Sequence, residues 1–494
     1  LTWSYPSSMK GYGSLGNVFG TFQNPDCCPV KGLQFDSPVA YTEAEAVCKY
    51  ALTSNIKSLR PDTLYLGVDI GGSTSDILVL GLGPDPATGN LEKELLAQCS
   101  VRMAAGLFFN AINQSKDFRH CLYQFHESRT TGVKVTNIRD IVSYDPRLYK
   151  QAPYYLNNIF DQLKDRTEFK TFYEYLRVNN PAIFALPAYV TGLLCTYSGI
   201  LIREAIEKRN LNMVNRISFR YYGKGGRMFE WLLFTFKDIA AEYLKACIRF
   251  GFGEKLQHIQ IELENLNVST DSPMENKSEV AIGLVSLSDN DRIIGINGRC
   301  TPKPAQQAQG GFPSGMPPTA NGAGFGSPFA AAPTQQAAAP SAFGGAFGGA
   351  FGGAQGSMPS DIQNNTSDEP RHDVIGERGI QFFENGQYRE LGELDVITEK
   401  MFATNNLIFP QQLFNFNWFF YYYSQYLKMT GCLPERAINQ LIQEAQQDPN
   451  LGTFFERDKN LDNIESYRMP IFIASGLKFL QDTLIPRIFN SNLR

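Results

Sequence analysis

The feature that most constrains the fold is a glycine turn between two apolar runs, in the segment LGVDIGGSTSDILVL at residues 66–80. One apolar run ends just before Gly71 and Gly72, and a second, Ile77–Leu80, follows the turn. Both runs have the length and the Leu/Ile/Val content of strands. Because consecutive glycines allow positive φ angles in a tight turn, the pattern predicts a β-hairpin.

The tip of this hairpin carries groups that suit an anion. Amide N–H groups in a glycine turn point into one concavity, and Ser73, Thr74 and Ser75 add hydroxyl donors. Asp69 ends the first strand and offers a hard oxygen ligand of the kind that Mg²⁺ prefers. The alternative is a hairpin whose polar residues only satisfy its own turn. The three hydroxyls and the acidic pair, Asp69 and Asp76, favour phosphate binding.

Composition excludes several classes of protein. The 494 residues allow two or three domains, and 43% hydrophobic with 19% charged residues is typical of a globular chain. A net charge of −4 argues against nucleic acid as a partner. Nine cysteines without a CxxC pair predict reduced thiols in a cytoplasmic protein, not a disulfide frame or a zinc site.

Two uncharged stretches, Val178–Ile202 and Met401–Leu427, are long enough to be candidate membrane spans. Each contains at least one proline and several polar residues, whereas a span needs about 20 predominantly apolar residues. We therefore expect two buried helices and no membrane contact. The densely aromatic part of the second stretch, Phe414–Leu427, predicts the core of a small helical domain.

A low-complexity segment separates two regions of different pattern. Residues 301–359 are rich in Gly, Ala, Pro and Phe, repeat an AFGG unit and predict a disordered linker. Upstream, apolar runs alternate with helical stretches, which predicts an α/β fold. Downstream, residues 360–494 have a mostly helical pattern.

The hairpin resembles the second phosphate motif, D-x-G-G-x-T-x-D, of the superfamily of actin, sugar kinases and heat-shock chaperones. Two segments before it also resemble that family. Thr2–Pro6 is similar to a first-lobe strand that ends in Pro, and Tyr41–Val47 is similar to the E-P-x-A-A crossover helix. Ala44 stands where the family has Pro.

Three segments after the hairpin extend the resemblance. Residues 217–231, ISFRYYGKGGRMFEW, resemble the adenosine motif, and Ser100–Leu107 resembles the glycine turn and helix that follow the hairpin. Lys277–Val285 looks like the A-x-G helix that returns the chain to the first lobe. Taken alone, the last could equally be an ordinary amphipathic helix.

The resemblance implies a ribonuclease-H-like lobe of the actin and heat-shock ATPase type, with ATP and Mg²⁺ as cofactors. Asp69 and Glu43 would hold Mg²⁺ through waters, and these two residues with Thr74 would form the catalytic set. The residues expected to bind the nucleotide are Gly71, Gly72, Ser73, Thr74, Gly106, Gly223, Gly225, Gly226 and Arg227. The family's first phosphate motif is expected to precede Leu1, so binding by this chain alone should be weak.

The expected organisation has four parts. Residues 1–58 would end the first lobe with the crossover helix, 59–300 would form the second lobe, 301–359 the linker and 360–494 a helical region that offers a surface for a protein partner. The implied function is an ATP-binding, ATP-hydrolysing switch of the chaperone type. An actin-like filament protein and a nucleotide-binding scaffold without turnover stay open as alternatives, with a sugar kinase a weaker one.

Overall fold

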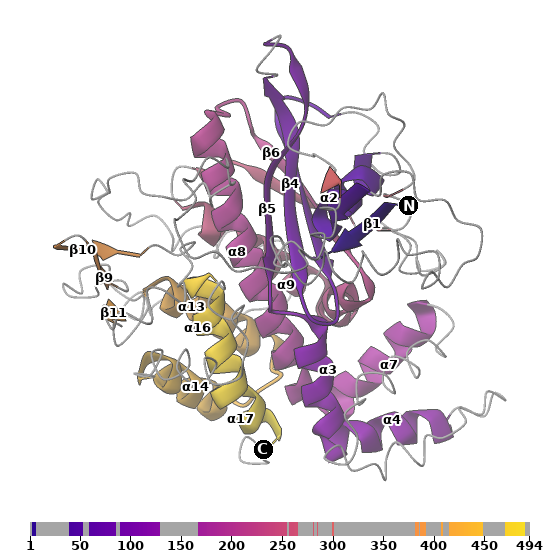
Figure 1. Cartoon of the computed structure of the whole chain (residues 1–494). Helices are drawn as coiled ribbons and strands as arrows, with labels where there is room; N and C mark the ends of the chain where they lie inside the picture. Colours follow the sequence, from indigo (N-terminus) through magenta and orange to yellow (C-terminus); the bar gives the residue numbers. More distant parts are fainter. Residues whose placement is uncertain are drawn as a thin grey trace, which may run out of the picture.

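A five-stranded mixed sheet forms the centre of the computed structural model (Figure 1). Its strands, in spatial order, are β5 (Leu91–Val101), β4 (Ser75–Pro84), β3 (Thr63–Ile70), β6 (Arg216–Tyr222) and β7 (Gln260–Leu263). The structure describes residues 2–5, 39–52, 59–84, 89–128, 166–253, 256–264, 280, 284, 299–300, 381–384, 386–391, 407–408, 414–447 and 470–489.

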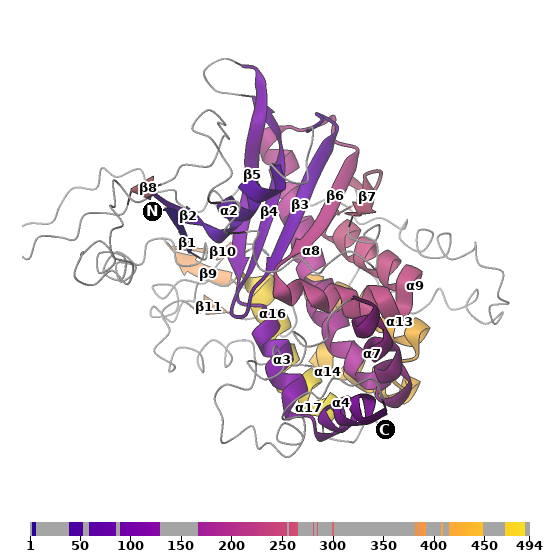
Figure 2. The same ribbon diagram turned by 90° about the vertical axis from the view of Figure 1, so that its right-hand side faces the viewer.

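The predicted hairpin is confirmed as β3 and β4, which pair antiparallel from Tyr65–Leu80 to Ile70–Ser75. β5 continues the meander, whereas β6 and β7 run parallel to β3 on its other side (Figure 2). β3 is therefore the central strand, with the antiparallel strand β4 on one side and the parallel strand β6 on the other. Both β3 and β6 end in a glycine turn at the same edge of the sheet.

Alternation along β3 separates two apolar cores. Leu64, Leu66, Val68 and Ile70 face a large cluster that contains most of the buried helical residues. Tyr65 faces a smaller cluster formed with helix α2 (Glu43–Tyr50). The helix begins with a capping box, in which the Thr42 hydroxyl accepts from the Glu45 N–H and the Glu45 carboxylate accepts from the Thr42 N–H.

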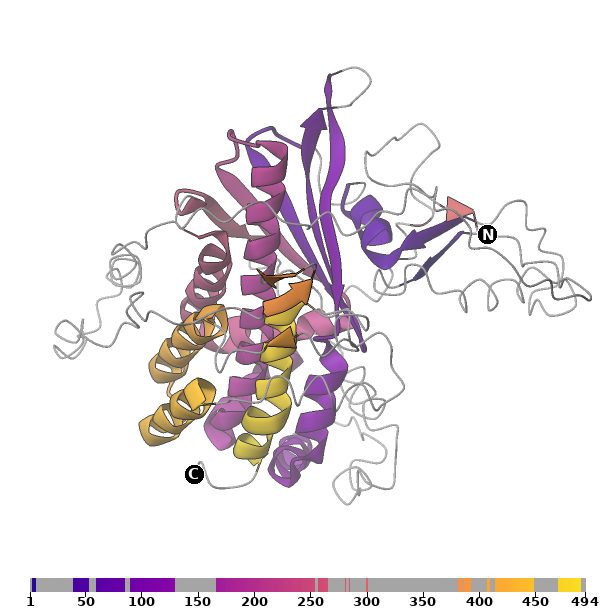
Figure 3. The same ribbon diagram turned by 60° about the vertical axis from the view of Figure 1, so that its left-hand side comes forward.

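A small second sheet lies beside α2 (Figure 3). It contains β1 (Thr2–Tyr5), parallel to β2 (Val39–Thr42), and β8 (Arg299–Cys300), antiparallel to β2. β2 leads directly into α2. Of the expected return helix Lys277–Val285, the structure describes Val280 and Leu284, both helical, and Val280 packs on the α2 cluster.

Two long helices, α8 (Ala185–Arg209) and α9 (Arg227–Phe252), lie along the other face of the sheet. Beyond the edge that carries the glycine turns lie α3 (Ala105–Gln114), α4 (Lys116–Ser128) and α7 (Arg166–Asn179), and the short η3 (Pro181–Phe184) leads into α8 (Figure 1). The segment Pro181–Arg209 is long and apolar enough to cross a membrane, yet its most apolar window is 100% buried inside the protein. It is thus a core helix, as the sequence predicted for this stretch.

The C-terminal part packs on α8 and α9. Its elements are a small sheet, β9 (Gln381–Glu384), β10 (Gln387–Glu390) and β11 (Leu407–Ile408), and the helices α13 (Phe414–Thr430), α14 (Glu435–Gln447), α16 (Ile471–Phe479), η9 (Leu480–Leu484) and α17 (Ile485–Phe489). The Tyr423 hydroxyl donates to the Ala185 carbonyl at 2.9 Å, and the Tyr189 hydroxyl donates to the Gly476 carbonyl at 2.9 Å.

The aromatic run of α13 is therefore core, as expected, but the core is not that of a separate small domain. Buried rings of α13, such as Phe419 and Tyr423, belong to the same apolar cluster as α8 and α9. The hydrophobic periodicity of the sequence could not reveal this, because it shows which face of a helix is buried but not which element covers that face. The predicted linker, 301–359, lies outside the described residues.

Candidate functional site

The hairpin tip is a tight turn that exposes two of the predicted phosphate ligands. The Gly71 N–H donates to the Thr74 carbonyl at 2.9 Å and closes the turn. Gly72 and Ser73 are exposed at the tip, while Gly71 and Thr74 are half-buried. The N–H of Gly71 is thus used inside the turn, whereas the tip faces outward.

Helix α3 begins directly against this tip. The N–H groups of Ala105 and Gly106 donate to the carbonyls of Gly71 and Gly72, at 3.1 and 2.9 Å. A Cβ at position 106 would lie 2.2 Å from the Gly72 carbonyl oxygen, so only glycine permits this approach. Gly106, which the resemblance predicts to bind the nucleotide, therefore uses its N–H to hold the hairpin in place.

The second glycine turn touches the end of β3. Gly223 follows Tyr222, which lies opposite Asp69 in the parallel pair β3–β6. Its φ of +73° favours glycine, and a Cβ there would lie 2.2 Å from Asp69 Oδ1. Two motifs about 150 residues apart in the sequence therefore adjoin at one edge of the sheet.

The rest of this turn is equally close to β3 and α3. A Cβ at Gly225 would lie 2.5 Å from the Ile70 carbonyl oxygen and 2.7 Å from the Ala105 Cβ. The Gly226 N–H donates to the Gly223 carbonyl at 3.0 Å, and α9 begins at Arg227. The first turn of α9 thus starts beside the hairpin.

Two carboxylates meet on the α2 face of the sheet. Asp69 and Asp76 are direct partners in the hairpin, with 6% and 2% of their surface exposed. Among the described residues no group of three His, Cys, Asp or Glu side chains could hold a metal ion. A cation here would therefore take its other ligands from water or a bound phosphate, as Mg²⁺ usually does. The two carboxylates therefore suit Mg²⁺, provided that water or phosphate oxygens complete its coordination.

Helix α2 begins at the same edge of the sheet. The Thr42 hydroxyl donates to Gln98 Oε1 at 3.0 Å, and Gln98 lies two residues before Ser100, the β5 partner of Asp76. Glu43, in the first turn of α2, is half-buried at this edge. Glu43 thus lies on the side of the sheet that carries the acidic pair.

A pair of tyrosines, not predicted from the sequence, links the second glycine turn to α2. The hydroxyls of Tyr65 and Tyr222 are hydrogen bonded, and the Tyr222 ring packs edge-on against Tyr50 of α2 at 6.2 Å. Burial raises the pKa of both hydroxyls, so both stay neutral at physiological pH. An apolar strand pattern gives no signal for this contact, because it depends on the pairing of β3 with β6.

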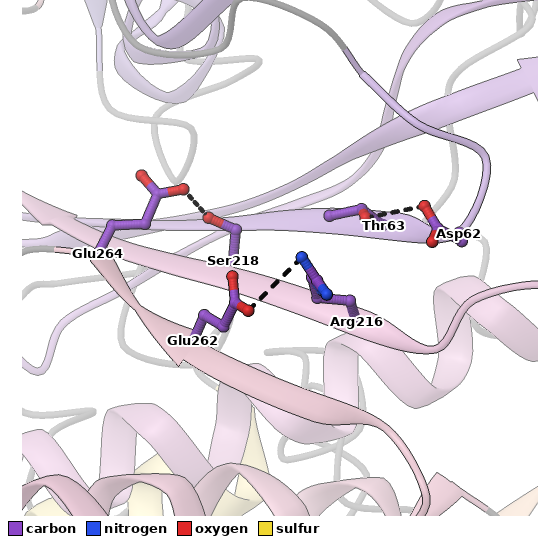
Figure 4. A network of polar contacts seen from close by, with 6 residues as sticks. All are labelled: Asp62, Thr63, Arg216, Ser218, Glu262 and Glu264. Atoms are coloured by element: carbon purple, nitrogen blue, oxygen red, sulfur yellow. Dashed lines mark hydrogen bonds and ion pairs between the residues drawn. The ribbon is translucent and has the colours of Figure 1, made fainter.

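The far half of β6 carries a different polar network (Figure 4). Arg216 and Glu262 form an ion pair at 3.5 Å, Ser218 donates to Glu264, and the Thr63 hydroxyl donates to Asp62 at 3.0 Å. Thr63 and Arg216 start their strands, so this end is opposite the glycine turns. The exposed ion pair is worth at most about 1 kcal/mol. This network holds the edge strand β7 and is not part of the candidate site.

Comparison with known proteins identifies no family. No family model matches the chain, and no curated protein matches it. One similar solved structure is a chain of a PilM-PilN type IV pilus biogenesis complex, with 13% sequence identity and a TM-score of 0.20. The match covers 52% of this chain and 53% of that one, so it spans about half of each. A TM-score this low does not establish a shared fold.

Proposed function

We propose that the chain binds a nucleoside triphosphate with Mg²⁺ between its two glycine turns, as one lobe of an actin- or heat-shock-type ATPase. The observation that carries the proposal is the contact of Gly223 with Asp69, which brings the predicted phosphate and adenosine motifs together. Ligands of open α/β sheets bind outside the carboxyl ends of strands, where the strand order reverses. β3 is that strand here, with β4 on one side and the parallel β6 on the other.

The hairpin tip would hold the phosphates. Among the described residues, the N–H groups of Gly72 and Ser73 donate to no backbone carbonyl, and both residues are exposed. The Thr74 hydroxyl would add a third donor. Residues Gly225 to Arg227, at the start of α9, would flank the nucleoside.

The acidic groups would hold the metal ion. Mg²⁺ would supply charge neutralisation for the phosphates. Asp69 would orient it and the attacking water, and Glu43 would hold a second of its waters. Hydrolysis at such a site depends on positioning and electrostatics more than on covalent chemistry.

A nucleotide-driven switch of the chaperone type is the function we favour over a filament. The C-terminal helices cover α8 and α9, so this face is not available to a stacking subunit. A bound nucleotide could act on these helices through α9, which starts at the site. A protein partner would then bind the C-terminal helical region.

Nucleotide binding is testable with two glycine variants. A fluorescent ATP analogue is titrated with Mg²⁺ into the full 494-residue chain and into G223A and G89A. Both glycines have positive φ, +73° and +70°, but a Cβ at Gly89 meets nothing within 4 Å. We expect weak binding that G223A reduces about tenfold or more, from the cost of strain at the site.

The G89A variant should bind as the wild type does, which separates a loss at the site from a general loss of stability. Circular dichroism of all three proteins checks that they fold. The proposal would be contradicted if G223A bound the analogue as tightly as the wild type. It would also be contradicted if the wild type bound no analogue at about 5 mM.

A further inference from the structure

Helix α9 contains a break that its sequence does not explain. Lys237 has φ +41° and ψ −113°, inside a helix that otherwise runs from Arg227 to Phe252. Sharp breaks usually occur at Pro or Gly, and the local sequence is Thr-Phe-Lys-Asp-Ile. An L-residue with a side chain is strained in this conformation, and such strain marks functional or switching positions.

The two halves of α9 belong to different parts of the molecule. The first half packs on the site: the Phe229 ring stacks on Tyr221 of β6 at 5.0 Å, and Trp231 packs on Phe108 of α3 at 5.1 Å. α3 in turn holds the hairpin tip through its first N–H groups. This half is therefore tied to both glycine turns.

The second half packs on α8 and on the C-terminal helices. The Tyr243 hydroxyl donates to the Ala188 carbonyl of α8 at 3.0 Å. Phe250 lies 5.6 Å from Tyr422 of α13. The break at Lys237 thus separates the site from the C-terminal part.

One side chain of α13 spans the break. The Tyr426 ring lies 5.9 Å from Phe236, just before Lys237, and 4.5 Å from Tyr243 after it. Any change in the angle between the two halves must therefore move Tyr426, and with it α13.

Unsatisfied hydroxyls gather at the same place. Within the described part of the chain, the buried hydroxyls of Thr235 and Tyr426 have no hydrogen-bond partner. In α8, by contrast, the hydroxyls of Thr191, Thr196 and Ser198 each donate to the carbonyl four residues earlier. A buried hydroxyl without a partner is costly, so the broken state carries two such costs besides the strain at Lys237.

We propose that α9 is a two-state helix: broken at Lys237 here and continuous in a second state, with the change coupling the glycine turns to α13. Backbone strain and two unsatisfied hydroxyls at one point lower the stability of the broken state and bring the second state within reach. Coupling between sites requires such a two-state element, and it is reciprocal. The consequence for nucleotide binding rests on the proposed function; the switch itself does not.

The first test is the order of stability of two variants at position 237 in the full chain. In a regular helix, glycine is less stable than alanine, but at φ +41° glycine relieves the strain that alanine keeps. We expect K237G to melt about 2 °C or more above K237A. A higher melting temperature for K237A than for K237G would show that the break is absent in solution and would overturn the proposal.

The second test perturbs α13 and follows the site by hydrogen exchange. Y426F removes an unsatisfied hydroxyl and favours the broken state. Because amides beside the break lack the continuous ladder of helical hydrogen bonds, we expect exchange at residues 234–239 to speed up about twofold or more, with exchange at residues 223–227 changing in the same variant. The matched control, Y423F, loses the bond to Ala185 and should speed exchange within α13 instead.

An effect of Y426F confined to α13 would overturn the coupling. Neither test adds nucleotide, so either result leaves the binding titration with G223A to be decided separately.

Discussion

At the scale of single residues, Asp69 is the group on which the candidate site depends. It is the penultimate residue of β3, pairs with Asp76 across the hairpin and contacts Gly223 of the second turn. Its surface is 6% exposed, and a charge at such a position needs nearby partners of opposite sign or polar groups. A cation with its waters would be one further partner for this carboxylate.

The D69N variant should lose the Mg²⁺ dependence of nucleotide binding. Asn keeps the shape of Asp, so the contact with Gly223 is retained, but the negative charge is absent. Where the protein hydrolyses ATP, turnover should fall about 10²-fold or more, the scale for losing one preorganised electrostatic group. Analogue titrations with and without Mg²⁺ measure the effect.

The control for this variant is D76N, which removes the partner carboxylate from the same face. We expect it to lower the stability of the hairpin and to keep the Mg²⁺ dependence. Unchanged Mg²⁺ dependence in D69N would make Asp69 a structural residue.

At the scale of elements, the end of α8 is attached to β5 by a buried acid. The Glu94 side chain is 2% exposed and pairs with Arg209, the last residue of α8, which is 51% exposed. Burial raises the pKa of Glu94 above its ordinary value of 4.5, although the Arg209 charge opposes the shift. This ion pair fixes the end of α8 to the sheet, although removing the Glu94 carboxylate from water costs free energy of folding.

The raised pKa predicts how stability depends on pH. The folded state holds the Glu94 proton more strongly than the unfolded state, so the free energy of unfolding falls as pH rises through the folded-state pKa. Because Gln cannot ionise, the stability of E94Q relative to the wild type should increase over that window and level off above it. Urea unfolding at several pH values from about 4 to 8 measures the difference.

The complementary variant, R209M, removes the charge that opposes the shift. Its stability should fall with pH more steeply than that of the wild type. A constant difference between E94Q and the wild type across the series would show that Glu94 titrates normally.

At the scale of the whole molecule, the C-terminal helices and the sheet-covering helices form one apolar core. Tyr189 of α8, for example, packs on Phe419 and Tyr423 of α13 at 5.4 and 5.2 Å. Aromatic rings that bury this much surface dominate the stability of such contacts. The described helices α8, α9, α13 and α16 should therefore unfold as one cooperative unit.

Limited proteolysis tests this unity. The sequence predicts that cleavage occurs first between residues 302 and 358, since disordered segments are preferred sites. The shared core predicts that the two resistant pieces stay associated and elute together in gel filtration.

Y423A should release the pieces by removing a buried ring, whereas K428A, at an exposed position of the same helix, should not. Separation of the wild-type pieces would show that the interface is weak. Rapid cleavage elsewhere, with 302–358 intact, would contradict the predicted linker.

The sequence alone determined the local features: the hairpin, the glycine turns and the buried α8. Each depends on neighbours in the chain, through backbone freedom at glycine, alternation of side chains or the length of an apolar run. The tertiary structure decided which of these meet. It placed Gly223 against Asp69, engaged the Gly106 N–H with the Gly72 carbonyl and joined α13 to the core of α8 and α9. The break at Lys237 is also tertiary, because a helical sequence without Pro or Gly near the break is held in this conformation only by what packs on either side of it.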